Sequence, residues 1–439
     1  MLPRVLVVTY YFPPAGGPGV QRTLKTVKYL REHGFEPVVL TVEDGAAPSR
    51  DETLVEDLPD GLEVVRTRAP DPLSLYGRVT GKADVPTGAV ESQGLLPRLA
   101  VWVRANVFLP DARVGWVPFA VRAGTTLLRD GHLEARPFAA VVTSGPPHSV
   151  HLAGLRLQRT GTPWIADFRD PWTAINFYDD LPMTPAARAL DRRFERRVLR
   201  AADAVTTVSP TWARLLERTA GLVAGSVEVV HNGVDLEDVP DERGPVRRDA
   251  FALSHVGSLY ATRDPAVVWQ ALRRLHEAGE IDRLVVRLVG KTDAGVLEAA
   301  RASGVPVEAV PYVTHAEAVR EQARAGLLLL TIEPFAAEDG MITGKLYEYL
   351  AIGRPVLGVG PVGGDAAALL AETGGGAMHA RDDLEGVTDA IRRHYRAWAA
   401  GCALEGAPRS AVAPYTRRAQ TGRLAEIVRS VQRGSSSRS

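Results

Sequence analysis

The sequence predicts an α/β protein made of two Rossmann-like parallel-sheet domains that face each other across a cleft. Short, β-rich apolar runs alternate with helical patterns along most of the chain, and this alternation starts a second time after a polar stretch at 235–249. Strands that alternate with helices favour parallel sheets, and 439 residues suffice for roughly two or three domains. Because ligands of such sheets bind beyond the carboxyl ends of the strands, we expect the chemistry in the loops that follow strands.

The first domain is expected over residues 1–235. A helix over 20–33 is predicted by apolar residues at three-residue steps, and Gly34 ends it. Residues 75–94 are Gly-rich and polar, which predicts a mobile loop, whereas 95–128 predict helices joined by a loop. Strands are expected at 5–10, 37–42, 62–67, 138–145, 163–170, 202–210 and 226–234.

The second domain is expected over residues 236–414. Its strands are predicted at 251–258, 284–290, 307–313, 326–332 and 355–360. Its helices are predicted at 265–279, 293–303, 316–325 and 345–353. An amphipathic helix follows at 416–431, and 433–439 are expected to be a disordered tail.

Composition excludes several classes of protein. Lys+Arg and Asp+Glu both total 52, and this zero formal charge argues against a nucleic-acid binder. The single cysteine, Cys402, permits neither a disulfide framework nor a cysteine-rich zinc site, which favours the cytoplasm. No apolar stretch approaches the ~18 residues of a transmembrane helix, and the N-terminal apolar run is too short for a signal peptide. Asp-x-Asp, Walker A and Gly-x-Ser-x-Gly motifs are all missing, which weakens metal–diphosphate, kinase and hydrolase readings.

The loop after the first expected strand, PPAGGPGVQR at 13–22, carries three glycines, among them Gly17. Glycines let the backbone approach a ligand closely, and the helix that follows directs its positive N-terminus to the same place. A phosphate or a sugar hydroxyl is the expected ligand, and a plain flexible connection is the alternative. The spacing is not GxGxxG, so a dinucleotide site is a weaker reading, supported only by acidic residues such as Glu43.

Polar side chains also follow two later strands. His148 and His151 come directly after the 138–145 run; they are interpreted as active-site hydrogen-bonding groups or structural histidines, because a metal would need a third ligand. Asp167, Arg169 and Asp170 surround the end of the 163–170 run and form either a structural ion-pair cluster or a site facing the cleft. We choose Asp170, the residue furthest beyond the strand, as the catalytic or acceptor-binding carboxylate.

Cations and one acid stand beyond strand ends in the second domain. Arg263 and Lys291 follow two successive strands, and together they suit a diphosphate whose charge must be neutralised as it leaves. Lys345 lies at the predicted N-terminus of a helix, a ready anion site, and Glu348 one turn on can accept hydrogen bonds from a ribose diol. Ordinary surface charges are the alternative.

Taken together, these motifs resemble the GT-B glycosyltransferases, specifically the retaining glycosyltransferase family 4 (group 1). The likeness runs from residue 4 to about residue 431. It is carried by VTYYFPPAGGPGVQR, TSGPPHSVHL, ADFRDPW, VSPTWARLL, VEVVHNGVD, HVGSLYATRDP, PYVTHAEAV and GKLYEYLAIGRPVL. The resemblance implies a nucleotide-sugar donor on the C-terminal domain, an acceptor on the N-terminal one, and a last helix, 415–432, that packs back on the N-terminal domain.

The resemblance also implies roles for individual residues of the donor site. Glu348 would bind the ribose, and the backbone around Tyr312 and Val313 would read the base. Arg263 and Lys345 would hold the diphosphate. Gly17 would lie near that diphosphate, and Lys291 is a weaker match for it.

The donor sugar is where the sequence departs from the family pattern. The family often has a sugar-binding glutamate eight positions before the ribose one, and Gly340 stands there, with Glu338 and Asp339 just upstream. The amides of Met341 and Ile342 are expected to share that contact.

The catalytic site departs from the family pattern too. The family often places a histidine after the 163–168 strand, and Arg169 and Asp170 stand there. Asp170, His148 and Arg169 are therefore our expected catalytic residues.

The expected function is a metal-independent, retaining transfer from a UDP- or GDP-sugar to a glycan, lipid-linked or small-molecule acceptor. Polysaccharide assembly and secondary-metabolite glycosylation are both compatible with it. The alternatives are a nucleotide-sugar epimerase of the same shape and a degenerate scaffold that binds a nucleotide sugar.

One segment bears on location. Residues 187–203 predict a basic amphipathic helix that could lie on anionic lipid at the inner face of the membrane. Asp191, Glu195 and Asp203 are expected to dilute its charge, and an ordinary surface helix is the alternative.

Overall fold

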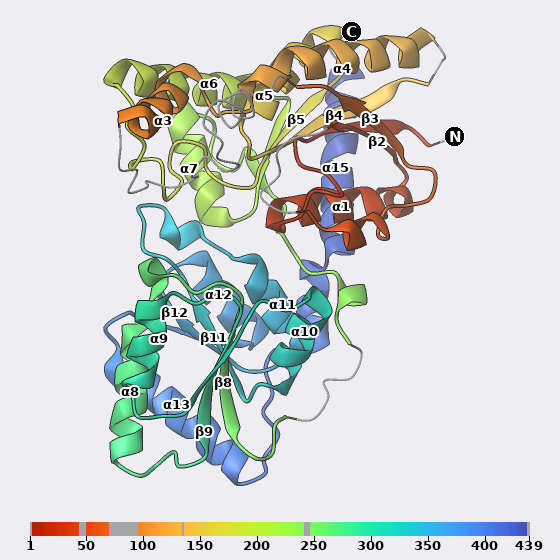
Figure 1. Ribbon diagram of the computed structural model, residues 1–439. Helices are drawn as coiled ribbons and strands as arrows, with labels where there is room; N and C mark the ends of the chain where they lie inside the picture. Colours follow the sequence, from red (N-terminus) through yellow and green to blue (C-terminus); the bar gives the residue numbers. More distant parts are fainter. Residues whose placement is uncertain (1, 44–49, 70–94, 134–135, 241–245, 437–439) are drawn as a thin grey trace. The chain divides into compact units, whose positions relative to one another are not determined.

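The computed structural model describes residues 2–43, 50–69, 95–133, 136–240 and 246–436 (Figure 1). The chain divides into two compact units: unit 1 comprises Met1–Asn232 and Arg417–Ser439, and unit 2 comprises Gly233–Thr416. The mobile loop expected at 75–94 lies outside the described residues.

Unit 1 is built on a seven-stranded, wholly parallel sheet with the order β3-β2-β1-β4-β5-β6-β7. Its strands are β1 Arg4–Val8, β2 Glu36–Val42, β3 Glu63–Thr67, β4 Phe138–Gly145, β5 Trp164–Phe168, β6 Ala204–Thr207 and β7 Val227–Val229. Its helices are α1 Pro18–Leu30, α3 Leu95–Val107, α4 Val117–Leu133, α5 Ser149–Leu157, α6 Pro185–Ala201, α7 Pro210–Ala220 and α15 Arg417–Ser436.

Both faces of this sheet are covered, which is why its central strands are continuous apolar runs. Helices α4, α5, α6 and α7 pack on one face, around Trp164 and Leu6. Helices α1 and α15 cover the other, where Val27 of α1 and Val428 of α15 share a core with Val7 of β1. The last helix therefore belongs to unit 1, although unit 2 precedes it in the chain.

The end of α15 corrects one prediction. The helix continues to Ser436, so residues 433–436, expected in a disordered tail, are helical. Extending an already nucleated helix adds one hydrogen bond for each residue fixed. The polar, serine-rich composition of the tail gives no sign of this gain, which is why disorder was predicted.

Several strands end earlier than their apolar patterns predict, because polar residues turn the chain into the next helix. The run expected at 202–210 is a strand only to Thr207, since Ser209 is the N-cap of α7 and Pro210 its first residue. Likewise β5 stops at Phe168, and Arg169 and Asp170 lie beyond it.

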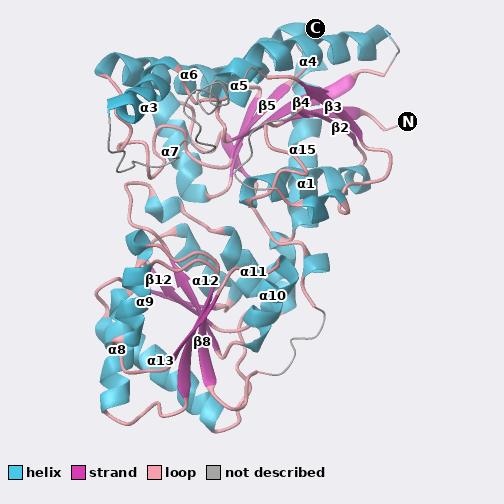
Figure 2. Cartoon of the chain, in the orientation of Figure 1, coloured by secondary structure: helices cyan, strands magenta, loops and turns pink. Residues whose placement is uncertain are grey.

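Unit 2 contains a six-stranded parallel sheet with the order β10-β9-β8-β11-β12-β13, between helices on both sides (Figure 2). Its strands are β8 Phe251–Val256, β9 Leu284–Val289, β10 Val307–Val310, β11 Leu327–Thr331, β12 Val356–Val359 and β13 Gly376–His379. Its helices are α8 Ala266–Glu277, α9 Ala294–Arg301, α10 His315–Arg324, α11 Gly344–Ile352, α12 Asp365–Thr373, α13 Leu384–Ala399 and α14 Arg409–Val412.

The segment between β12 and α15 holds elements that the sequence patterns did not reveal. The edge strand β13 has the sequence GAMH, with no β-branched residue and no full burial. It is a strand because it pairs with β12, from Gly376 opposite Val356 to His379 opposite Val359. Tertiary pairing, rather than local preference, decides this element.

No described helix is both long and apolar enough to cross a membrane.

Candidate functional site

The predicted site residues gather where the strand order of each sheet reverses. In unit 1 the order reverses between the neighbouring strands β1 and β4, and the loops after these strands carry Gly17 and His148. In unit 2 it reverses between the neighbouring strands β8 and β11, and the segments after these strands lead to Arg263 and Lys345. Such switch points leave a crevice at the carboxyl ends of the strands, where ligands of open α/β sheets bind. We call the unit 1 residues Gly17, His148, Arg169 and Asp170 the first strand-end site, and the unit 2 residues Arg263, Lys291, Lys345 and Glu348 the second strand-end site.

Arg169 joins the two loops of the first strand-end site. Its guanidinium donates to the carbonyl oxygens of Gly145, at 3.0 Å, Pro146 and Gly19. A Cβ at Gly19 would lie 2.8 Å from Nη1 of Arg169, so the glycine makes room for this contact. The neighbouring Gly17 is the N-cap of α1 with φ 109°, a conformation that favours glycine. The guanidinium N–H groups of Arg169 therefore bind backbone carbonyls around the site.

The buried ion pair at this strand end does not include Arg169. Asp167 pairs with Arg22 of α1, whose Nη2 and Nε lie 2.7 and 3.0 Å from its carboxylate oxygens. Ser144 and Thr206 also donate to Asp167, at 2.8 and 2.7 Å. Burial raises the pKa of Asp167, but the Arg22 charge and these hydrogen bonds outweigh it and bring the pKa to about 2. Arg22 was not among the predicted site residues, because its partner is 145 residues away in the sequence.

The carboxylate of Asp170 has no hydrogen-bond donor among the described residues and is available to a ligand. The residue is half-buried, and no described group donates a hydrogen bond to it. Burial raises its pKa, and the charges of Arg169 and Arg22 oppose that rise. Its proposed catalytic or acceptor-binding role stays a prediction.

His148 and His151 lie among aromatic rings at the start of α5. The ring of His148 stacks on Trp172, with centroids 5.1 Å apart and an interplanar angle of 6°, and the ring of His151 stacks on Phe168 at 4.4 Å. Burial holds both histidines neutral, with the pKa of His148 well below its usual value and that of His151 at about 3. Neither ring nitrogen of His148 has a partner among the described residues, so both have unused hydrogen-bonding capacity.

Arg263 and Lys291 meet at one aromatic ring in the second strand-end site. Arg263 Cζ and Lys291 Nζ lie 5.2 and 5.7 Å from the ring centroid of Tyr260. The loops that carry them are joined, since the Leu259 N–H donates to the Lys291 carbonyl at 2.8 Å. Two cations at adjacent strand ends form a suitable subsite for a diphosphate.

Lys345 lies in the first turn of α11 and Glu348 in the second, and each has a neighbour that the sequence did not reveal. Nζ of Lys345 lies 3.1 Å from Nε2 of His255 in β8. Nε2 of Gln322 in α10 donates to Oε2 of Glu348 at 3.1 Å. Both neighbours are buried, His255 at 2% and Gln322 at 1% exposure.

The base-reading and sugar-binding residues lie in two other loops of unit 2. Tyr312, between β10 and α10, is 87% exposed, and Val313 beside it is half-buried. Glu338 is paired with Arg381, and Arg381 also donates to the Ile332 carbonyl at 2.9 Å. Arg381 thus bridges Ile332 and Glu338 in the loop after β11. The Glu338 carboxylate, one of the two predicted for sugar binding, is therefore already paired.

The rest of the predicted sugar-binding loop differs in exposure. Asp339 is exposed and Gly340 is buried. Ile342 belongs to the core of unit 2, and Met341 packs against it, so only their backbone amides suit a ligand.

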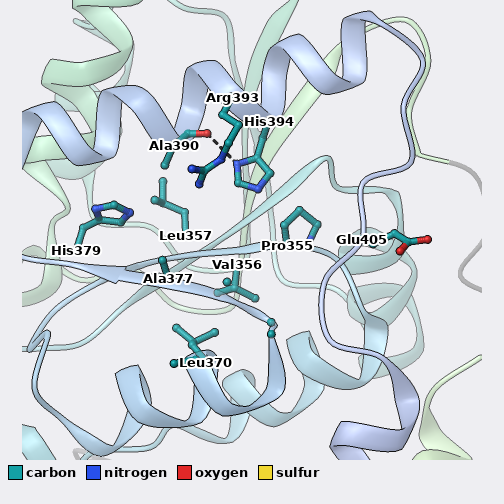
Figure 3. A pocket seen from close by; sticks show the side chains of 14 residues that line it. Pro355, Val356, Leu357, Leu370, Ala377, His379, Ala390, Arg393, His394 and Glu405 are labelled. Atoms are coloured by element: carbon teal, nitrogen blue, oxygen red, sulfur yellow. Dashed lines mark hydrogen bonds between the residues drawn. The ribbon is translucent and has the colours of Figure 1, made fainter.

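Two hollows of unit 2 lie apart from these residues. One, of about 260 Å³, is bounded by β12, β13 and α13 (Figure 3). His394 lines it, and its Nδ1 lies 2.8 Å from the Ala390 carbonyl. The other, of about 760 Å³, is lined by charged side chains that include Arg247 and Glu308. None of the predicted site residues lines either hollow.

Within the described residues, no three His, Cys, Asp or Glu side chains come together as a metal site. His148 and His151, considered as ligands in the sequence analysis, have ring centroids 5.9 Å apart.

The sequence matches known proteins over part of its length. The model of the glycosyl transferase 4-like domain matches residues 16–233. A glycogen synthase from Anaeromyxobacter dehalogenans (strain 2CP-C) is 30% identical over 240 residues, which cover 48% of this chain and 46% of that protein. The chain thus spans about half the length of this curated relative.

Solved structures match the chain over nearly its whole length. A sucrose-phosphate synthase from Thermosynechococcus elongatus has a TM-score of 0.61 at 14% identity, and a glycosyltransferase from Rickettsia africae ESF-5 has 0.60 at 11%; each match covers 98% of both chains. The Anabaena protein HepE, solved in complex with UDP and glucose, has 0.59 at 14%, covering 97% of this chain and 99% of that one. At these identities the likeness is one of fold, and the fold is GT-B.

Proposed function

Since residues 16–233 of this chain belong to the glycosyl transferase 4-like domain family and the chain has the GT-B fold, we propose that it moves a sugar from a nucleoside-diphosphate donor to an acceptor hydroxyl with retention at the anomeric carbon. The observation that carries the proposal is the second strand-end site. Three cations and an acidic residue stand beyond the carboxyl ends of β8, β9 and β11, as a diphosphate and a ribose require.

In the proposed reaction the bond between the anomeric carbon and the phosphate oxygen breaks, and a bond to the acceptor oxygen forms on the same face. The acceptor proton passes to the departing phosphate, so no enzyme nucleophile is needed. Arg263, Lys345 and the N-terminus of α11 stabilise the charge that develops on the diphosphate. Lys291 adds a cation at the rim, and these positive groups take the place of a metal ion.

We assign the base and ribose contacts to residues of unit 2. Glu348 accepts from the ribose hydroxyls, and the backbone at Tyr312 and Val313 contacts the base. UDP is the first nucleotide to test, because HepE was solved with UDP and glucose; GDP is the second. The amides of residues 340–342 and the exposed Asp339 contact the donor sugar.

We assign the acceptor to unit 1. The unpartnered nitrogens of His148 and the carboxylate of Asp170 bond acceptor hydroxyls, and Arg169 holds the loops that present them. Glycan assembly and secondary-metabolite glycosylation both supply such acceptors.

The exposed side of α6 supports a further partner, an anionic lipid surface at the inner face of the membrane. The acids expected to dilute its charge do not: Asp191 and Glu195 are 1% and 2% exposed and accept hydrogen bonds from Trp172 and Thr173. The exposed residues of the helix are then mostly arginines, namely Arg192, Arg193, Arg196, Arg197 and Arg200. The remaining acid, Asp203, lies just beyond the helix end.

Exposed apolar side chains lie on α3, a helix that contacts α6. Helix α3 is joined to the start of α6, because Asn106 accepts from the Thr184 N–H at 2.7 Å. Leu99 and Trp102 of α3 are 57% and 44% exposed. Arginines beside exposed apolar residues are the combination that interfacial helices use. The proposed enzyme is cytoplasmic and binds the membrane only peripherally.

A thermal-shift screen in EDTA tests the donor site. The purified protein is mixed with UDP, GDP, dTDP and ADP, each with and without a sugar ester. One of them is expected to raise the melting temperature, since about 1,000-fold excess over Kd adds about 4 kcal/mol. The shift should vanish in Glu348→Ala and persist in Glu298→Ala, which removes an exposed acid of α9.

Release of the nucleoside diphosphate then tests the reaction class. Release that depends on an acceptor supports transfer, whereas turnover of the donor alone indicates an epimerase. Binding without any turnover indicates a scaffold.

A further inference from the structure

His255 is oriented by two hydrogen bonds at the end of β8. Its Nδ1 lies 3.0 Å from the carbonyl oxygen of Leu329 in β11, and its Nε2 lies 3.1 Å from Nζ of Lys345. A carbonyl oxygen can only accept, so Nδ1 carries the proton and donates. Nε2 then presents a lone pair and accepts from the Lys345 ammonium. The Ser258 carbonyl is further from Nε2, at 3.4 Å.

The charges around this pair favour the same protonation states. Burial and the charges of Lys345 and Arg263 lower the pKa of His255 to about 3, so the imidazole is neutral in any ordinary assay. Burial and Arg263 lower the pKa of Lys345 to about 8, and Glu348 on its own helix opposes that shift. Lys345 is therefore charged at neutral pH but close to losing its proton.

Gly257 provides the space that Lys345 occupies. A Cβ at this residue would lie 2.5 Å from Nζ and 2.7 Å from Cε of Lys345, and its φ of 117° is one that side chains rarely adopt. The lysine thus lies along bare backbone just after β8 and ends at His255. Neither the close approach nor the hydrogen bond would survive a shift of the side chain.

We propose that His255 is a positioning residue of the donor site, whose neutral Nε2 holds the Lys345 ammonium by one hydrogen bond and leaves its other two N–H groups for the diphosphate. The inference rests on the proposed function, because it takes the anion that Lys345 meets to be the donor diphosphate. A lysine held in this way loses little freedom when the donor binds.

Donor affinity should depend on the protonation of Lys345. A charged Lys345 binds the diphosphate, so the Kd of a sugar ester such as UDP-glucose or GDP-mannose is expected to rise about tenfold between about pH 7 and about pH 9, as the charged fraction falls about tenfold. Sugar esters are the right probes, because their diphosphate does not titrate in this range. Calorimetry in EDTA measures the Kd.

Two substitutions separate positioning from packing. His255→Phe keeps the ring volume and removes the acceptor; its Kd is expected to be about tenfold higher at pH 7, with the alkaline loss of affinity moved to lower pH. His255→Gln carries an amide oxygen that can accept from Lys345, and its Kd should stay within about threefold of the wild type. A His255→Phe protein with the wild-type Kd and pH profile overturns the inference and leaves the proposed function standing. A wild type that binds no nucleotide contradicts the proposed function instead.

The tautomer is measured without any substitution, should His255→Phe not fold. In protein labelled with ¹⁵N-histidine, long-range proton–nitrogen spectra distinguish a protonated ring nitrogen from a bare one. His255 is expected as the neutral, Nδ1-protonated form throughout the range in which the protein is folded. A proton on Nε2 would remove the acceptor and overturn the inference.

Discussion

The guanidinium of Arg22 and the carboxylate of Asp167 form a buried pair, with Nη2 and Oδ1 2.7 Å apart, where β5 ends beside α1. The same arginine donates to the His231 carbonyl at 2.9 Å, near the end of the unit 1 sequence that precedes unit 2. The pair therefore ties α1, β5 and the segment after β7 together beneath the first strand-end site.

Removing the charge of Asp167 should destabilise unit 1 strongly. Asp167→Asn leaves the Arg22 guanidinium buried without its counter-charge, which costs about 3–5 kcal/mol in such sites. Denaturant unfolding followed by tryptophan fluorescence measures the loss. Asp130→Asn changes an acid on α4 whose side chain is 50% exposed; it is the matched control and should cost less than about 0.5 kcal/mol. Equal losses in the two variants would contradict the prediction.

Acid should destabilise the protein before its carboxylates titrate. The pKa of His151 is about 3 in the folded chain against 6.5 when unperturbed, so the neutral form is favoured by folding. Its contribution is complete above pH 6.5 and is lost as the pH falls toward 3. The denaturant concentration at the midpoint of unfolding should therefore decrease as the pH is lowered below 6.5, and it should decrease less steeply in His151→Gln. The exposed His315→Gln should retain the wild-type slope.

Arg169→Lys should impair turnover although it preserves the charge. Lysine cannot span the carbonyls of Gly145, Pro146 and Gly19 with a planar fork, so the two loops that it joins would shift. Small misplacements near a reacting centre cost about 10²-fold, and we expect a loss of that order in kcat/KM for the acceptor. Donor affinity, measured by calorimetry, should be unchanged. A lysine variant with wild-type turnover would show that the loops do not need this arginine.

Gln322→Leu should weaken nucleotide binding, although Gln322 itself is not expected to contact the nucleotide. The substitution removes the hydrogen bond to Oε2 of Glu348 and frees that carboxylate to rotate. A hydrogen bond to a charged group contributes about 1.5–3 kcal/mol, so a rise in donor Kd of roughly tenfold is expected. The acceptor KM should not change. If the Kd of Gln322→Leu equals that of the wild type, Glu348 is held by other contacts.

The basic face of α6 should bind anionic vesicles. Each arginine near an anionic bilayer adds about 1 kcal/mol, so Arg193→Glu with Arg197→Glu should lower the affinity at least tenfold. Co-sedimentation with phosphatidylglycerol-containing vesicles measures it, and phosphatidylcholine alone should not bind the protein. Arg301→Glu with Arg393→Glu makes the same charge change in unit 2 and should bind like the wild type. Binding that resists high salt would point to another mode of attachment.

Much of the fold could be predicted from the sequence, because the signals are local. An apolar run such as β4, Phe138–Gly145, is recognisable by itself, since a strand covered on both faces needs no alternation. The position of a motif after a strand also places Arg263 and Lys345 at one edge of a parallel sheet. The short strand β13 escaped notice, because its pairing with β12, and not its composition, makes it a strand.

The sequence by itself therefore determined which residues stand at the strand ends, and hence the class of ligand that the second strand-end site suits. Only the tertiary structure decided their partners: Arg22 for Asp167, His255 for Lys345 and Gln322 for Glu348. Each partner comes from another strand or helix, and the register of the sheet and the packing of the helices bring it within hydrogen-bond distance. Neither the strand register nor the helix packing can be predicted from the residues next to each group. Because these contacts are buried, where the dielectric constant is low, each one strongly affects the protonation state and the orientation of the side chain that it holds.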